Sequence, residues 1–253
     1  MVTFNEAQIL AWALPLLWPF LRALALFTSA PVLSSRSVPV RVKIGLALLV
    51  AVAAQPTLPV MPVAALDSAV GLAMVAQQVL IGVTMGFAAR VVFAALEFAG
   101  ELIGLQMGLN FAGFFDPVSG AAGTATSRFF GTMAAFLFVV INGHLLLTMA
   151  LVNSFDAFPV SDAPLAVFEA LRPQEWGAEI FKLGLWVALP IVAMLLFVNL
   201  VLGVISRVAQ QLQIFSVGFS ITVSVGMVGM LMTLPLLQGP FLATLDRMLA
   251  LFQ

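Results

Sequence analysis

The chain has 253 residues, of which 62% are hydrophobic and only 8% are charged, and its net charge is −1. Globular proteins are about 45–50% apolar and about 25% charged, so this composition excludes a soluble fold. It predicts an all-α, polytopic membrane protein. The near-neutral charge gives no indication that nucleic acid is a partner. Cysteine is absent and histidine occurs once, which excludes disulfides, thiol catalysis and multi-histidine metal sites. We therefore expect no cofactor and no metal.

Six apolar segments have about the length, roughly 20 residues, that a membrane helix needs. Their approximate ranges are 8–33, 42–60, 69–107, 129–158, 180–205 and 214–237. A shorter tail, 241–252, also has apolar residues at helical spacing. The alternating pattern of a membrane β-barrel is absent. A polar turn, "SRVAQQLQ", separates the last two long segments and predicts a helical hairpin.

The third segment is too long for one span and carries Glu97 and Glu101 near its end. Residues four apart share a helix face, where two like charges repel. An ionisable side chain facing lipid costs about 2.5–3.5 kcal/mol, so we expect both to face protein, water or a polar cavity. Equally, this end of the helix could protrude from the bilayer. An ion site is disfavoured because oxygen-rich surroundings are missing.

Glycines in the same segment are spaced for close helix packing. Gly82 and Gly86 form one GxxxG pattern, and Gly100, Gly104 and Gly108 form two more in register. Glycine at this spacing lets two helix backbones approach closely within a membrane. We expect the second group to pack the helix against a neighbour, although membrane helices are generally rich in glycine.

The polar residues within apolar segments do not form a catalytic constellation. No GxxxxGK[ST] phosphate loop is present, and we expect no enzymatic activity. His144 and Asn142 are expected to make hydrogen bonds between helices, with a proton relay as the alternative for the histidine. Other amides need partners away from lipid, within the chain or in other subunits: Gln77, Gln78, Asn110, Asn153 and Asn199. Their number predicts that the chain belongs to a larger membrane complex.

A soft segment, "GLQMGLNFAGFFDPVSGAAGTATS" (104–127), lies between two apolar segments. It begins with helical glycine spacing, passes several phenylalanines and an Asp-Pro turn signal, and ends in small residues. Phenylalanine is a poor choice for a solvated linker. The composition therefore predicts a mobile apolar loop.

Four stretches in order carry a resemblance that covers nearly the whole chain. They are "LLWPFLRALALFTSAPVLSSRSVPVRVKIGLAL" (16–48), "GLQMGLNFAGFFDP" (104–117), "INGHLLL" (141–147) with "NSFDAFPV" (153–160), and "ALPIVAMLLFVNLVLGVISRVAQQLQIFSVGF" (188–219). In this order and spacing they resemble the FliR family of flagellar biosynthetic proteins. The resemblance departs from the family pattern at Gln210 and Ser220, where the family usually has proline.

The resemblance implies a core subunit of the flagellar type III export gate, in the bacterial inner membrane and the flagellar basal body. Its implied partners are FliP, FliQ and FlhB, unfolded flagellar export substrates and membrane lipids. Residues 1–179 would be a FliP-like helical part with a plug loop at about 105–127, and residues 180–253 a FliQ-like hairpin with a tail. The implied plug and gating residues are Met107, Asn110, Phe111, Phe114, Phe115, Asp116 and Pro117.

Three alternatives stay open at this point. The first is the equivalent subunit of a virulence injectisome, which shares the architecture. The second is a small-molecule secondary transporter, which inverted repeats would favour; none is visible in the sequence. The third is a structural scaffold whose loop has no gating role.

Overall fold

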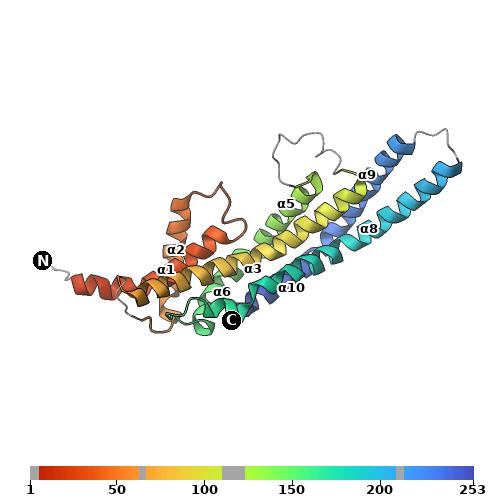
Figure 1. The fold of residues 1–253 in the computed structure, drawn as a ribbon. Helices are drawn as coiled ribbons and strands as arrows, with labels where there is room; N and C mark the ends of the chain where they lie inside the picture. The colour runs from red at the N-terminus through yellow and green to blue at the C-terminus, as the bar shows by residue number, and fades with distance from the viewer. Residues whose placement is uncertain (1–5, 63–66, 110–122, 209–213) are drawn as a thin grey trace. The chain divides into compact units, whose positions relative to one another are not determined.

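A computed structural model of the chain describes residues 6–62, 67–109, 123–208 and 214–253, and the regular structure of these residues is entirely helical (Figure 1). The α-helices are α1 (Glu6–Ser29), α2 (Val40–Ala54), α3 (Ala69–Met107), α5 (Ala125–Val140), α6 (Gly143–Ala157), α7 (Ala166–Leu171), α8 (Gly177–Val208), α9 (Ile214–Thr233) and α10 (Gln238–Leu249). Four short 3-10 helices accompany them: η1 (Gln55–Thr57), η2 (Pro173–Trp176), η3 (Leu234–Leu236) and η4 (Ala250–Phe252). The all-α fold class is confirmed.

Several of these helices can cross a membrane. Among the described residues, four helical stretches are long and apolar enough, and a fifth is obtained if the bent pair α5–α6 counts as one span. The four are Val40–Thr57, Ala69–Met107, Ala166–Val208 and Val217–Leu236. This arrangement confirms a polytopic helical membrane protein.

The predicted segment 129–158 is wrong as a single helix. α5 and α6 are bent by 67° at the break between them. Asn142 lies in the break with φ 57° and ψ 36°, a left-handed conformation that asparagine adopts more readily than most residues. Its carbonyl then accepts the N–H groups of Leu145 and Leu146, which starts α6. Apolar periodicity continues through such a break, so the pattern alone does not reveal it.

The chain forms two compact units. Unit 1 contains residues 1–90, 138–176 and 245–253, and unit 2 contains residues 91–137 and 177–244. α3 runs through both, so neither unit is a continuous stretch of sequence. The division into 1–179 and 180–253 expresses a likeness to other subunits, and it stays a prediction.

Unit 1 is built where α1 meets α3. A Cβ atom on Gly82 would collide with the backbone carbonyl of Arg22, and one on Gly86 would lie 2.8 Å from the backbone nitrogen of Ala30. The two glycines therefore let α1 lie directly on the backbone of α3, which confirms the packing predicted for this pair. The Ser29 hydroxyl, which donates to the Ala25 carbonyl of its own helix at 2.8 Å, also lies 3.4 Å from the Gly82 carbonyl.

The buried guanidinium of Arg22 links α1 and α3 to α6. Arg22 is fully buried, and its Nε donates to Gln78 Oε1 at 2.8 Å. Its Nη1 donates to the carbonyl and the hydroxyl of Ser154, both at 2.8 Å, and its Nη2 donates to the Phe158 carbonyl at 2.9 Å. The guanidinium carbon also lies 3.6 Å from the centre of the Phe155 ring. Carbonyls at a helix C-terminus carry partial negative charge, so the end of α6 stabilises the cation.

The amides of α3 complete this polar junction. Gln78 donates to Gln77, whose own amide donates to Ser161 Oγ at 2.7 Å and accepts the Ser161 N–H at 2.9 Å. The two glutamines thus have partners within the protein, as the sequence predicts. Because Arg22, Gln78 and Ser154 lie on three helices, the junction fixes α1, α3 and α6 relative to one another.

Unit 2 is built from the second half of α3 together with α5, α8 and α9. The face of α9 that is buried here consists of small residues, among them Gly218, Thr222, Gly226 and Gly229. A Cβ on Gly229 would lie 2.6 Å from the end of Met194 of α8, so α8 and α9 pack as the predicted hairpin. A Cβ on Gly184 of α8 would lie 2.6 Å from the Phe98 ring and 2.8 Å from the Ala95 carbonyl oxygen, both of α3.

Candidate functional site at the two ends of segment 110–122

The carboxyl end of α3 is a defined stop in the helix. The N–H of Gly108 donates to the Leu105 carbonyl at 3.1 Å, and that of Leu109 donates to the Gly104 carbonyl at 3.0 Å. These two bonds, with Gly108 at φ +78°, form a Schellman motif. A positive φ is available to glycine at little cost. Gly108 therefore ends α3 immediately before segment 110–122.

Met107 anchors this end of α3 to α9. Its side chain is buried and occupies the space that a Cβ on Gly226 would need, 2.6 Å from the methionine Cγ and Sδ. The Thr222 hydroxyl, which donates to the Phe219 carbonyl at 3.0 Å, also lies 3.4 Å from the Met107 carbonyl. The end of α3 that precedes segment 110–122 is thus attached to α9 mainly by packing.

A cavity of about 530 Å³ opens beside this anchor, between the end of α3, α8 and α9. Its lining is mostly apolar and small, with a few polar groups. The lining residues are Leu105, Gln106, Met107, Gly108, Asn199, Leu202, Gly203, Ser206, Gly218, Phe219 and Thr222. It adjoins the point where α3 ends, so the chain enters segment 110–122 at its edge.

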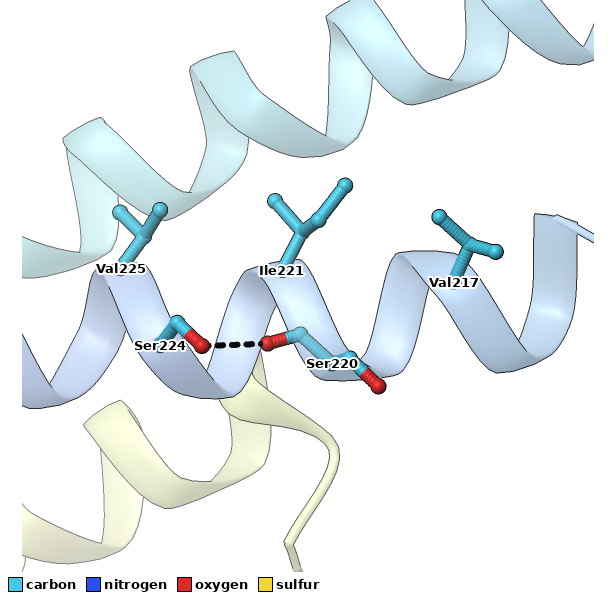
Figure 2. Close-up of a pocket in the computed structure, with 5 residues that line it drawn as sticks. All are labelled: Val217, Ser220, Ile221, Ser224 and Val225. Carbon is cyan, nitrogen blue, oxygen red and sulfur yellow. Dashed lines mark hydrogen bonds between the residues drawn. The ribbon is translucent and has the colours of Figure 1, made fainter.

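A second hollow, of about 490 Å³, lies along α9 (Figure 2). Val217, Ile221 and Val225 point to one side of the helix in Figure 2. The Ser224 hydroxyl donates to the Ser220 carbonyl at 2.8 Å, so it is satisfied within its own helix. This surface offers apolar contact and no cluster of polar groups.

The amino end of α5 is anchored to α3. Thr124 Oγ1 accepts the Ser127 N–H at 3.2 Å, and the Thr124 N–H donates to Glu101 Oε1 at 3.1 Å. A Cβ on Gly100 would lie 2.7 Å from Ser127 Cα, so the two backbones are in direct contact. The residues that follow segment 110–122 are therefore bonded to α3, and Met107, which precedes it, packs on α9.

The predicted plug residues divide between the described and the remaining part of the chain. Met107 is buried at the end of α3. The other predicted plug and gating residues lie outside the described residues: Asn110, Phe111, Phe114, Phe115, Asp116 and Pro117. Their sealing role stays a prediction.

The predicted packing and polar residues lie at several places. Gly100 touches α5, Gly104 is buried in α3, and Gly108 forms the helix end described above. Asn142 and His144 are exposed at the start of α6, and Asn199 is exposed at the cavity edge. Hydrogen bonds of these three side chains to other helices remain a prediction.

Two features were not assigned from the sequence. One is Arg22, whose acceptors Gln78 and Ser154 lie 56 and 132 residues away along the chain. The other is the link from Glu101 to Thr124. The sequence contained a signal for the second, because Thr124 precedes an apolar helix as a capping residue does.

These features define an all-helical membrane protein in which a long central helix ends beside a cavity. The model of the bacterial export proteins, family 1, matches residues 13–248. The chain is 44% identical to the flagellar biosynthetic protein FliR of Pectobacterium carotovorum subsp. carotovorum, over 94% of this chain and 90% of the relative. It is 43% identical to FliR of Escherichia coli (strain K12), over 95% and 92%, and 32% identical to FliR of Bacillus subtilis (strain 168), over 83% and 82%. The chain therefore belongs to the FliR family of flagellar biosynthetic export proteins.

Proposed function

We propose that this protein is a core subunit of the flagellar type III export gate, where it helps to form the pore and seals it when no substrate passes. The gate would lie in the bacterial inner membrane, within the flagellar basal body, and pass unfolded flagellar proteins. The family assignment supports a flagellar role in export. The relatives compared above are all flagellar, which favours this function over the injectisome counterpart.

The observation that supports the sealing role is the attachment of the residues on both sides of segment 110–122. Met107 is packed on α9, and Thr124 is bonded to Glu101 of α3. A segment fixed at two points of one compact unit can close an opening next to that unit. Its three phenylalanines would exclude water, as apolar constrictions do in channels.

Exposed apolar side chains on α8 and α9 support an assembly with other subunits. Phe197 and Leu200 of α8, and Val228, Leu231 and Met232 of α9, are all more than half exposed. In a membrane complex such faces are covered by neighbouring helices or lipid. We propose FliP, FliQ and FlhB as the neighbouring subunits.

The test of the seal keeps the assembled gate and changes the segment. One variant lacks residues 110–122, and a second keeps the length but replaces Phe111, Phe114 and Phe115 with serine. Uptake of a small membrane-impermeant dye by cells expressing the gate is expected to rise in both. Affinity purification in mild detergent, followed by mass spectrometry, checks that the partners still copurify. Unchanged uptake with normal copurification would overturn the seal.

A further inference from the structure

The amino end of α5 has a capping arrangement that the helix does not complete by itself. In a capping box, the first residue's side chain accepts the N–H three residues later, and a Glu or Gln at that later position accepts the first residue's N–H. Thr124 makes the first bond, to Ser127. The residue three positions on is Ser127 itself, so no carboxylate of α5 stands there. Glu101 of α3 supplies the missing acceptor for the Thr124 N–H, at 3.1 Å.

The peptide group that joins Gly123 to Thr124 is held from both sides. Its N–H donates to Glu101, and its carbonyl accepts Arg128 Nη2 at 3.4 Å. Two side chains of opposite charge therefore fix the orientation of one peptide plane. Gly123 has φ +85°, a conformation that other residues rarely adopt. The chain is thus constrained in direction immediately before Thr124, the residue that caps α5.

Close contact between the backbones of α3 and α5 brings the Glu101 carboxylate within hydrogen-bonding distance of the Thr124 N–H. Gly100 precedes Glu101 and lies against the backbone of Thr126 and Ser127, with 2.7 Å between its hypothetical Cβ and the Thr126 carbonyl oxygen. Any larger residue at position 100 would push α5 away. The neighbouring carboxylate, Glu97, lies one turn earlier beside Gly131 of α5, away from the cap. The two acids of α3 thus face the same helix at different places.

We propose that Glu101 is a positioning residue that completes the cap of α5 from a neighbouring helix and so fixes where segment 110–122 ends. A carboxylate at a helix N-terminus is also favoured by the helix dipole. The inference rests on the proposed function, because a fixed end matters for export only if the segment seals the pore. The hydrogen bond itself can be tested independently of the seal.

The experiment compares Glu101→Ala and Glu101→Gln with Glu97→Ala, each in the full chain copurified with its partners in detergent. Hydrogen exchange of the amides in residues 124–128 is the first readout. Loss of a bond to a charged group is expected to speed the exchange by about tenfold in Glu101→Ala. Glu101→Gln retains an acceptor oxygen and is expected to give a smaller change, and Glu97→Ala none. If the Glu101→Ala protein does not accumulate, the exchange rate of residues 124–128 in Glu101→Gln is compared with that in Glu97→Ala instead.

Dye uptake by cells expressing the same variants is the second readout. Faster exchange together with higher uptake in Glu101→Ala supports both the positioning role and the seal. Faster exchange with unchanged uptake supports the positioning role and contradicts the seal. Exchange that stays at the wild-type rate, or rises equally in Glu97→Ala, overturns the positioning role whatever the uptake.

Discussion

Charged side chains bind helix-end backbone groups in both units, but with different strength. In unit 1, Arg22 is fully buried and makes four hydrogen bonds, two of them to carbonyls near the C-terminus of α6. In unit 2, Glu101 is partly exposed and, within the described part of the chain, accepts one hydrogen bond, from the N-terminal cap of α5. Both charges suit the helix end that they meet. The amino end of α5 thus meets the negatively charged Glu101 of α3. The carboxyl end of α6 meets the positively charged Arg22 of α1.

The two junctions are expected to differ in strength. A buried charge that loses its partners is strongly destabilising, by about 3–5 kcal/mol, so the Arg22 junction must persist whenever unit 1 is folded. A single bond of a partly exposed carboxylate is far weaker, because water replaces it readily. The stronger of these two sets of polar contacts belongs to unit 1, and the weaker one, in unit 2, involves the residues that follow segment 110–122.

The largest effect is expected for Arg22→Ala. The substitution leaves the Gln78 amide and the Ser154 hydroxyl and carbonyl buried with fewer partners, at a cost of about 1–3 kcal/mol for each group left unsatisfied. The purified protein should unfold at clearly lower temperature, and its amount in membranes should fall in an immunoblot. Arg36→Ala is the control, because Arg36 is exposed. If Arg22→Ala and Arg36→Ala unfold at the same temperature, the Arg22 junction is not a strong contact.

A smaller loss is expected for Gly82→Ala. The added methyl group meets the carbonyl of Arg22 itself, so α1 must move away and the bonds of Arg22 lengthen. Overpacking of this kind costs about 1–3 kcal/mol. Gly45→Ala is the matched control, because nothing lies within 4 Å of a Cβ there; alanine should be neutral or stabilise α2 by up to about 1 kcal/mol. Thermal unfolding in detergent measures both, and a Gly82 variant as stable as the Gly45 variant would contradict the close contact.

The smallest effect is expected where Met107 meets α9. Gly226→Ala should cost about 1 kcal/mol, since the methionine side chain is flexible and can shift. Combining it with Met107→Ala should cost less than the sum of the single variants, because the truncated side chain leaves room for the new methyl group. A double-mutant cycle on unfolding free energies measures this coupling. Strict additivity would show that the two residues do not share the space.

Composition and local pattern predicted most of the helices. The limits of α3 agree with the predicted 69–107, and the polar turn correctly separates α8 from α9. Hydropathy could not reveal the break at Asn142, because the apolar run continues while one residue changes conformation. The short α7 was also missed, since six residues give too little periodicity.

The site was less predictable because its contacts are distant in sequence. Spacing showed that Glu97 and Glu101 share a helix face, but only the fold shows that Glu101 reaches Thr124. Similarly, the sequence marked Gln78 as needing a partner without indicating that Arg22 is that partner. Gly108 was assigned from its spacing to helix packing, and its positive φ is a property that spacing does not encode.

The distance along the chain between Arg22 and its acceptors has a consequence for biosynthesis. Ser154 and Phe158 follow Arg22 by 132 and 136 residues. At about 5–20 residues per second, the ribosome needs on the order of ten seconds to synthesise them. During that interval a guanidinium in an apolar helix has neither α6 nor the Phe155 ring beside it. We therefore expect nascent α1 to keep this guanidinium in water or among lipid headgroups until α6 has been made.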